Sequence, residues 1–305
     1  MRSAEVMSPR IASQFTLVPL DTEGDWNRPL LENAAALSDA PCLFASSGSS
    51  GAFQNAPRLL DEVMDGFQHI VACEAVRESR SVYTFPAPRG KTAVIVGNEE
   101  TGVPRSVLKR ADAIVVVPMA GAGMSSINVA ASAAVVLYAF SRDLGRRKKP
   151  TCRLRRRDID VLIDAPPDPH ELGSLLRSAW AFGWRRIFVA DEHRVWFSEE
   201  QKVILEGRAA ARRAKNPIAV LPAGRLDPAD YDGIAVCDGR REGTPLSRWR
   251  LPACERLLTV IGTGVNRVRP DAERVFVDHV NVDVTPRFRH AGSILLSAIS
   301  ELSAA

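Results

Sequence analysis

The sequence has few of the residues that build metal sites and disulfide frameworks. Its 305 residues include five cysteines and five histidines, without CxxC, HxxxH or HExxH spacing. An odd number of widely separated cysteines in a long chain favours reduced thiols with a structural role. We therefore expect no disulfide framework and no metal.

Long apolar segments are also missing. The first 21 residues mix charged and apolar side chains and lack the apolar stretch of about 7 to 15 residues that a signal peptide needs. The longest apolar run, residues 130–140, is interrupted by Ser132 and is too short to cross a bilayer. Hydrophobic residues make up 46% and charged residues 25%, as in globular proteins. These features predict a cytoplasmic protein without a membrane span.

Positive charge is concentrated in two stretches, although the net charge is only +4. Residues 142–157 hold nine lysines and arginines, and a second cluster comprises Arg208, Arg212, Arg213 and Lys215. Clustered basic side chains are typical of phosphate binding. The predicted RNA-binding residues are Arg146, Arg147, Lys148, Lys149, Arg153, Arg155, Arg156 and Arg157. The alternative is a solvated linker.

The first basic stretch also predicts a domain boundary. Gly145 follows a helix-like run, and Pro150 disfavours helix at the residue before it. The chain length fits two domains. We predict a first domain over residues 1–146, a basic linker over 147–157 and a second domain over 158–305.

Apolar runs alternate with helical segments in both halves. The expected strands are 16–20, 42–45, 70–73, 93–96 and 114–117, then 161–163, 187–189, 218–221, 233–237, 258–261 and 274–277. The expected helices are 29–37, 58–66, 104–110 and 128–144, then 172–182, 199–214 and 291–302. The alternation predicts an α/β protein with mostly parallel sheets flanked by helices.

Two similar stretches indicate an internal duplication. Residues 30–37 read LLENAAAL, residues 175–182 read LLRSAWAF, and an expected strand follows each. Both halves also end in a helix rich in small residues. A repeated unit of this size indicates duplication. The alternative is chance similarity between two strand–helix units.

Two segments of the first half combine a buried strand with a glycine-rich turn. Residues 93–104 read AVIVGNEETGVP, and residues 114–134 read IVVVPMAGAGMSSINVAASAA. Loops at the carboxyl ends of parallel strands are where α/β folds bind ligands. Gly97 and Gly102 permit tight turns and a close backbone approach.

Together, GNExxG, VPMxG and SINVAASAA resemble motifs 2 and 3 of the SpoU/TrmH branch of the SPOUT RNA methyltransferases. The resemblance covers residues 97–134, and the loop between Gly121 and Ser126 is one residue longer than the commonest form. It implies two tandem α/β-knot domains, each with a C-terminal trefoil knot that is degenerate in the second domain. It also implies S-adenosylmethionine (SAM) as the cofactor.

The resemblance assigns roles to the motif residues. The implied cofactor-binding residues are Gly97, Asn98, Val117, Met119, Gly121, Ile127 and Asn128. Glu99, Ser126 and Asn128 are implied to be polar catalytic groups near the transferred methyl. Ser126 and Asn128 also fit the N-cap of a helix, and the two roles are compatible.

The remaining family motif carries an arginine in an N-x-G-x-x-x-R pattern. Residues 171–177 read ELGSLLR and place Arg177 correctly, whereas the first half has Glu32 where the arginine would be. The second half lacks the Asn-Glu pair and the Ser-x-Asn sequence. Because the family usually forms homodimers with the site at the interface, the resemblance implies a monomer that is a fused pseudodimer. Its single site would hold SAM in the first domain and take the catalytic Arg177 from the second.

The implied function is SAM-dependent methylation of ribose 2′-hydroxyl groups in ribosomal or transfer RNA. Two alternatives remain open. One is a catalytically silent, RNA-binding SPOUT scaffold. The other is an O-methyltransferase that acts on a small nucleoside-like acceptor.

Overall fold

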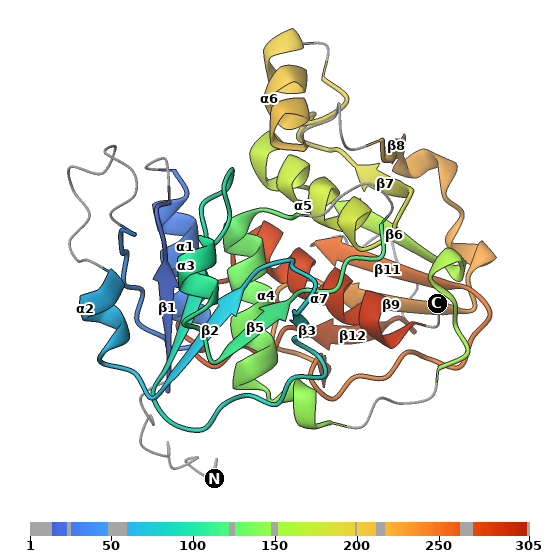
Figure 1. Ribbon diagram of the computed structural model, residues 1–305. Helices are drawn as coiled ribbons and strands as arrows, with labels where there is room; N and C mark the ends of the chain where they lie inside the picture. The colour runs from blue at the N-terminus through green and yellow to red at the C-terminus, as the bar shows by residue number, and fades with distance from the viewer. Residues whose placement is uncertain are drawn as a thin grey trace, which may run out of the picture.

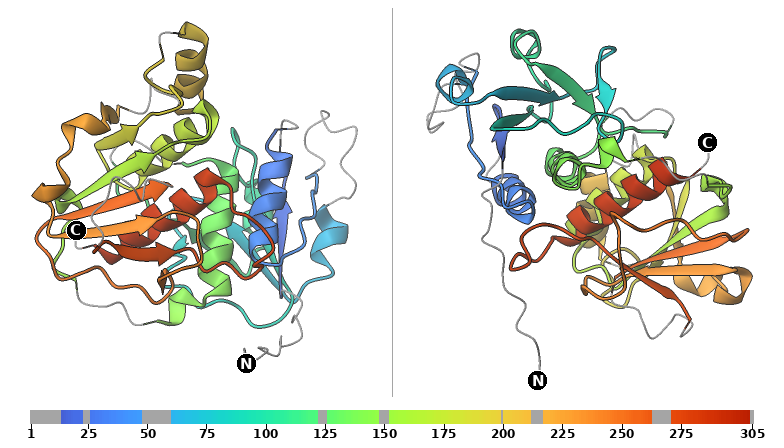
Figure 2. Two further views of the ribbon diagram at one scale, coloured as in Figure 1. Left: turned by 180° about the vertical axis from the view of Figure 1, so that it is seen from behind. Right: turned by 90° about the horizontal axis from the view of Figure 1, so that it is seen from below.

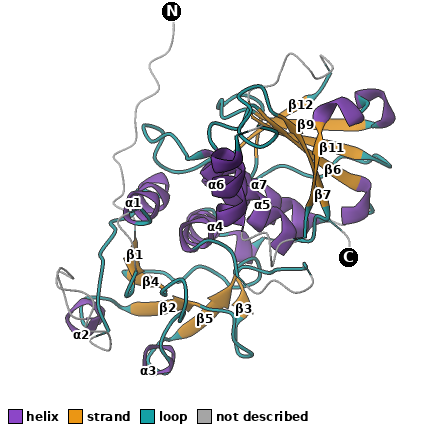
Figure 3. Ribbon diagram, turned by 90° about the horizontal axis from the view of Figure 1, so that it is seen from above, coloured by secondary structure: helices purple, strands orange, loops and turns teal. Residues whose placement is uncertain are grey.

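Two parallel sheets enclose a layer of helices (Figure 1, Figure 3). The computed structural model describes residues 14–22, 26–47, 60–121, 126–147, 152–198, 200–211, 217–262 and 271–303. The first sheet has the order β1-β4-β2-β5-β3, with β1 (Phe15–Pro19), β2 (His69–Cys73), β3 (Arg80–Ser81), β4 (Thr92–Val96) and β5 (Ala113–Val116).

The second sheet has the order β10-β12-β9-β11-β6-β7-β8. Its strands are β6 (Ile159–Asp164), β7 (Arg186–Ala190), β8 (Ala219–Pro222), β9 (Gly233–Cys237), β10 (Thr244–Pro245), β11 (Leu257–Gly262) and β12 (Glu273–Phe276). Every strand of the first sheet therefore precedes residue 117, and every strand of the second follows residue 158.

The helices fall into an inner and an outer group (Figure 3). They are α1 (Arg28–Leu37), α2 (Leu60–Met64), α3 (Arg105–Leu108), α4 (Val129–Ser141), α5 (Pro169–Ala181), α6 (Gln201–Ala211) and α7 (Phe288–Leu302). Helices α1, α4, α5 and α7 lie between the sheets, whereas α2 and α3 cover the outer face of the first sheet. Helix α6 packs on α5 and projects beyond the layers (Figure 2). None of the helices in the described part of the chain is both long and apolar enough to span a membrane.

The observed elements confirm the predicted α/β class, and the differences have local causes. Residues 42–45, predicted as a strand, run beside β1 but make only two isolated parallel bridges, Leu17–Cys42 and Leu20–Ala45. The two-residue strands β3 and β10 were not predicted, because so short a segment carries no period-two pattern. Parts of the predicted helices 58–66 and 199–214 lie outside the described residues.

The strands of the sheet centres are apolar on both faces. All five residues of β1 and of β4 are buried. In β4, Val94 and Val96 face the helix layer, while Ala93 and Ile95 pack under α2 and α3. Continuous burial is expected where helices cover both faces of a parallel sheet. It explains why these strands read as unbroken apolar runs in the sequence.

Helix α4 is the centre of the helix layer. Eleven of its thirteen residues are buried, because it packs against the first sheet, α1 and α7 at once. A helix that is apolar around its whole circumference is stable only when enclosed in this way. One hydrophobic core consequently runs without a break from Phe15 in the first half to Ile299 in the second.

The strand order repeats between the halves. The order β6-β11-β9-β12-β10 in the second sheet matches β1-β4-β2-β5-β3 in the first. The strand starts Phe15 and Ile159 are separated by 144 positions, as are the helix C-caps Ser38 and Phe182. By this separation, Asn33 is the first-half equivalent of Arg177. The prediction that Glu32 is the equivalent was wrong by one residue. The cause is that the Leu-Leu pairs used to align the halves, 30–31 and 175–176, are 145 positions apart instead of 144.

Polar contacts between buried side chains join the halves. The Tyr138 hydroxyl donates to Oδ1 of Asp278 at 2.7 Å, and the Ser247 hydroxyl donates to Oδ2 at 2.6 Å. Burial, with the adjacent Asp278 carboxylate, raises the pKa of Tyr138 well above its usual value, so it remains a donor. A second buried tyrosine, Tyr83, donates to Ser297 of α7 at 2.8 Å.

Some arginines of the predicted basic linker are hydrogen-bonded to the second half, and most are exposed. Arg147 donates to the carbonyl of Ser247, and the half-buried Arg156 donates to the carbonyl of Ser300 at 3.1 Å. Burial lowers the pKa of Arg156. Arg146 is exposed and lies 3.0 Å from Asp143. Exposed side chains are also found at Arg153, Arg155 and Arg157, while Lys148 and Lys149 lie outside the described residues.

The two tyrosines provide a matched test of how the halves are held together. A hydrogen bond to a charged group contributes about 1.5–3 kcal/mol, and one between neutral groups about 1 kcal/mol. Tyr138→Phe should therefore lower the free energy of unfolding more than Tyr83→Phe does. Urea denaturation of both variants measures the difference. Equal losses would contradict a special contribution from Asp278.

Candidate active site

A cavity of about 1030 Å³ lies where the two halves meet, at the carboxyl ends of β2, β4 and β5. Its volume is at the upper end of the range for small-molecule sites. Nine predicted site residues line it: Gly97, Asn98, Glu99, Val117, Met119, Ser126, Ile127, Asn128 and Arg177. Helices α5, α6 and α7 of the second half supply the opposite wall.

The turn after β4 is held in shape by its own polar residues. The Asn98 amide donates to the carbonyl of Asp21 at 2.7 Å and accepts from the backbone N–H of Glu100 at 2.8 Å. A Cβ at Gly97 would come within 2.2 Å of the Gly102 backbone. Asn98 and Gly97 therefore shape the rim of the cavity. The Asn98 amide is already hydrogen-bonded to backbone groups of the protein.

Glu74 is a residue of this site that the sequence analysis missed. It follows β2 directly, and its Oε2 accepts from the Val103 N–H at 2.7 Å. Gly102 has a positive φ of 69°, and a Cβ there would meet Glu74 Oε2 at 2.4 Å. A polar residue immediately after a buried parallel strand was the available signal.

Glu99 is tied to the start of α1. The Asn27 amide, at the N-cap of α1, donates to Glu99 Oε1. This contact joins the turn after β4 to the helix that carries the counterpart of Arg177. Asn27 itself corresponds to Glu171 in the second half, by the same separation of 144 positions.

Asn128 caps α4 with its side chain. Its Oδ1 accepts from the N–H groups of Ala130 at 3.0 Å and Ala131 at 3.3 Å. The N-cap interpretation of this asparagine is confirmed. The positive end of the α4 dipole thereby faces the cavity.

Arg177 crosses from the second half to the first. Its Nη2 donates to the Ser126 hydroxyl at 2.8 Å, and its Nε donates to the Ser126 carbonyl at 3.3 Å. The side chain is 7% exposed. Arg177 and Ser126, which come from different halves of the chain, therefore meet at one point of the cavity wall.

Gly121 is the predicted cofactor-binding residue that does not line the cavity. Its N–H donates to the Ala181 carbonyl at 2.8 Å, and a Cβ would lie 2.0 Å from the Trp180 carbonyl oxygen. Glycine is needed here because the loop after β5 passes against the end of α5. The following residues, 122–125, lie outside the described part of the chain.

The start of α7 in the second half is equivalent to the start of α4 in the first. There Asn33 takes the place of Arg177, and neutral groups fill the position. Asn33 donates to the Thr285 carbonyl at 3.1 Å and accepts from the Arg287 N–H at 3.2 Å. His290 Nδ1 lies 2.9 Å from the same Asn33 oxygen. Burial, with Arg289 and Arg287 nearby, lowers the pKa of His290 to about 3, so the imidazole stays neutral. Thr285 and Arg287 stand where Ser126 and Asn128 stand before α4.

A buried ion pair supports the second-half wall. Glu171 and Arg289 are 7% and 5% exposed, and Arg289 Nε lies 2.8 Å from Glu171 Oε1. The Arg289 N–H donates to the other carboxylate oxygen, also at 2.8 Å. The pair fixes α5 against α7, one and a half turns from Arg177. It was not predicted, because the sequence does not show that α7 starts beside α5.

The basic linker lies far from this cavity. Asn128 at the start of α4 lines the cavity, whereas the linker follows the other end of the same helix. Thirteen helical residues at 1.5 Å each put about 20 Å between them. No cluster of three potential metal ligands was found among the described residues.

The ion pair generates a sharp stability prediction. Glu171→Ala leaves the Arg289 charge buried without its partner and should cost about 3–5 kcal/mol of unfolding free energy. The double variant Glu171→Leu with Arg289→Met replaces both charges by apolar groups and should recover most of that loss. Urea denaturation of the single and double variants is the measurement. A double variant as unstable as the single one would contradict this account.

Comparison with known proteins identified one family. The sequence model of the SpoU rRNA Methylase family matches residues 47–138. The comparison with curated protein sequences gave no match.

Solved structures with similarity include the A. aeolicus TrmH/SpoU tRNA modifying enzyme, at 19% identity over 47% of this chain and 82% of that one, with a TM-score of 0.34. The SpoU methyltransferase AviRb from Streptomyces viridochromogenes, in complex with AdoMet, is 20% identical over 48% of this chain and 64% of its own, with a TM-score of 0.35. A probable methylase family protein from Haemophilus influenzae Rd KW20 is 16% identical over 67% of this chain and 90% of its own, with a TM-score of 0.36.

The family match covers β2, β4, β5 and most of α4, the elements that build the first-half wall of the cavity. The chain therefore contains, over residues 47–138, a domain of the SpoU rRNA methylase family.

Proposed function

We propose that the chain is a SAM-dependent RNA methyltransferase that modifies ribose 2′-hydroxyl groups of ribosomal or transfer RNA. Its one composite site would use the cofactor half from residues 1–146 and the catalytic arginine from residues 158–305. The observation that carries the proposal is the contact of Arg177 with Ser126 across the halves. The repeated strand order further supports a fused pseudodimer, in which the loops after β4 and β5 would form the predicted knot.

The first-half wall fits an adenosyl group. Val117 and Ile127 are buried and form an apolar surface next to Met119. The turn after β4 adds the polar residues Asn98, Glu99 and Glu100 at the same edge. This combination of a largely apolar lining with a few placed polar groups is typical of cofactor sites. When bound, SAM would supply an electrophilic methyl group.

Arg177 would act on the acceptor oxygen by its charge. A guanidinium remains protonated in proteins and cannot itself remove a proton. A positive charge next to a hydroxyl favours the ionised form and stabilises negative charge that develops on the oxygen. The contact with Ser126 holds the guanidinium at the start of α4, whose dipole adds to the same effect.

The second half would serve only to complete this site. The place of Arg177 is taken by Asn33 in the first half, and the side chain of Asn33 is occupied by contacts to Thr285, Arg287 and His290. A neutral amide cannot supply the charge that the proposed chemistry needs. The asymmetry therefore supports one site in each chain.

Arg177→Ala tests the composite site. The variant should bind SAM with an affinity within about threefold of wild type by calorimetry. Its single-turnover methyl transfer from labelled SAM to total RNA should fall by about 100- to 1000-fold, the effect of losing one electrostatic stabiliser. Arg225→Ala, which removes an exposed arginine outside the cavity and outside the linker, is the matched control and should keep the rate.

A wild-type rate in Arg177→Ala would refute the composite site. If the wild-type protein itself takes up no SAM at millimolar concentration, the silent scaffold is the better description. Transfer to free nucleosides without RNA would favour the small-acceptor enzyme.

The exposed arginines of the linker are proposed to bind RNA away from the cavity. Arg153, Arg155 and Arg157 are exposed, and Arg157 has only a solvated contact of 3.7 Å with Asp158. Changing all three to alanine should reduce the slope of log K against log salt by about 2, at about 0.7 for each single-stranded phosphate contact. Fluorescence anisotropy with labelled RNA measures the slope.

The control for this variant removes the same charge elsewhere. Arg225, Arg240 and Arg248 are exposed arginines of the second half outside the linker. If replacing them changes the slope as much as the linker variant does, net charge and not the linker accounts for RNA affinity.

A further inference from the structure

Trp26 is an exposed indole at the mouth of the cavity. It is 58% exposed and lines the cavity, although most large apolar side chains of the chain are buried. It directly precedes Asn27, the N-cap of α1 whose amide is bonded to Glu99. The backbone that carries the indole is therefore anchored to the turn after β4. An aromatic side chain held at a cavity mouth without burial in the core offers a free π-face.

Two exposed side chains, an arginine and a histidine, lie on the wall across the cavity. Arg287 and His170 are exposed on the second-half side, and both line the cavity. The acidic residues of that wall are used internally, because Asp168 caps α5 at 2.8 Å and Glu171 pairs with Arg289. No ion pair to the Arg287 side chain occurs among the described residues.

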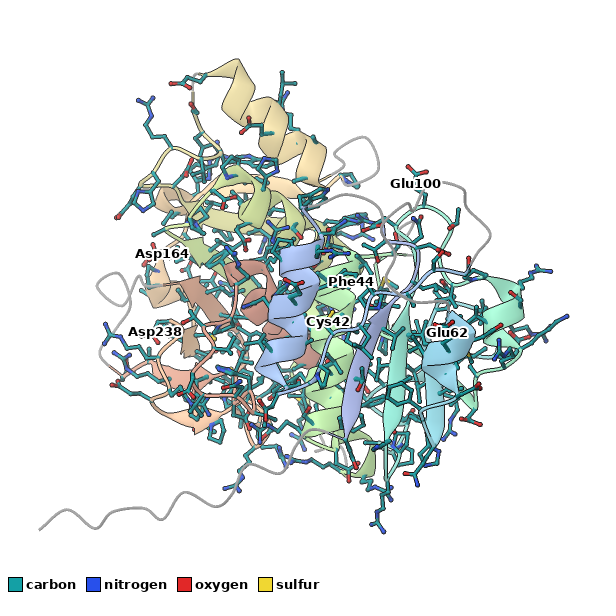
Figure 4. All side chains as sticks on the ribbon, turned by 90° about the vertical axis from the view of Figure 1, so that its left-hand side faces the viewer. Cys42, Phe44, Glu62, Glu100, Asp164 and Asp238 are labelled. Carbon is teal, nitrogen blue, oxygen red and sulfur yellow. The ribbon has the colours of Figure 1, made fainter. Side chains whose placement is uncertain are left out.

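The other acidic residues of the lining, Glu74, Glu99 and Glu100, lie on the first-half side. Glu100 is exposed at the outer edge of its loop, on the opposite side of α1 from Asp164 and Asp238 (Figure 4). It follows Glu99 on the turn after β4 and lines the cavity. Three acidic residues therefore lie on the first-half side of the lining, whereas Arg177, Arg287 and Arg289 lie on the second-half side.

Deeper in the cavity is a hydroxyl without a partner. Ser174 is 4% exposed, and its Oγ makes no hydrogen bond within the described structure. It lines the cavity one helical turn before Arg177 on α5. The Oγ atom itself has almost no accessible surface, so Ser174 contributes other atoms to the lining.

These groups match the parts of one RNA segment. A nucleobase stacks on aromatic rings, and phosphates bind cationic side chains. The bases of a duplex are already stacked, and only an unpaired or extruded base can reach a side chain at a cavity mouth. The arrangement thus favours a single-stranded or looped segment over a helix.

We propose that Trp26 is the stacking platform for an unpaired nucleobase of the RNA, with Arg287 and His170 binding the adjoining phosphates across the cavity mouth. The inference rests on the proposed function and adds the subsite that selects single-stranded RNA. The indole thus positions the acceptor segment and takes no part in methyl transfer.

The experiment compares two probes that carry the same number of phosphates. One is a fluorescent 12-nucleotide single-stranded RNA of mixed sequence, and the other is its abasic counterpart. Stacking of one base is worth about a 5- to 100-fold change in affinity. Trp26→Ala should lose RNA affinity by that factor and leave the affinity for the abasic oligomer unchanged. Trp26→Phe should recover part of the loss.

Two further variants separate stacking from charge and from general surface effects. Arg287→Gln should weaken binding of both probes equally and reduce the salt slope by about 0.7. Phe197, 40% exposed and outside the cavity lining, gives the control Phe197→Ala, which should bind both probes as wild type does. SAM calorimetry on each variant should be unchanged.

The outcomes distinguish this inference from the function on which it rests. If the wild-type protein binds SAM and RNA but Trp26→Ala keeps the wild-type ratio between the two probes, the stacking platform is overturned and the proposed function stands. If the wild-type protein binds neither probe even at low salt, both are overturned. An equal loss for both probes in Trp26→Ala also overturns stacking.

Discussion

The contact between Arg177 and Ser126 exists because α4 and α5 are buried in one helix layer. Helix α4 is apolar on every side and can be stable only when the first sheet, α1 and α7 enclose it. That enclosure brings the start of α4 beside the middle of α5. The geometry of the candidate site therefore follows from the burial of a helix that itself has no ionisable side chain near the cavity.

The two equivalent ends of the helix layer differ in charge, because one contains Arg177 and the other contains Asn33. At the cavity, Arg177 is buried against a hydroxyl and a carbonyl, and Glu171 and Arg289 neutralise each other nearby. At the reciprocal point, Asn33 and a neutral His290 replace the charge. A buried charge is expensive unless polar groups surround it, and Ser126 supplies two of them to Arg177. The two ends of the helix layer therefore differ in charge.

Much of the architecture was predictable from local patterns. Strands such as β1 and β4 are continuous apolar runs, which reflects burial on both faces of a parallel sheet. The turns after β4 and β5 carry glycines and polar residues at the ends of those strands, and the cavity forms there. The alignment of the halves was less secure. A shift of one residue separated Glu32 from Asn33, and only the matched ends of strands and helices corrected it.

The sequence by itself determined the α/β class, the position of the cavity-lining turns and the presence of Arg177 in one half only, because each depends on residues close together in the chain. The tertiary structure decided which distant groups meet. It put Arg177 on Ser126, paired Glu171 with Arg289, used Gly121 against the end of α5, and left Trp26 at the cavity mouth. These contacts depend on how α4, α5 and α7 pack. Packing between residues 51 to 118 positions apart leaves no periodic signal in the sequence.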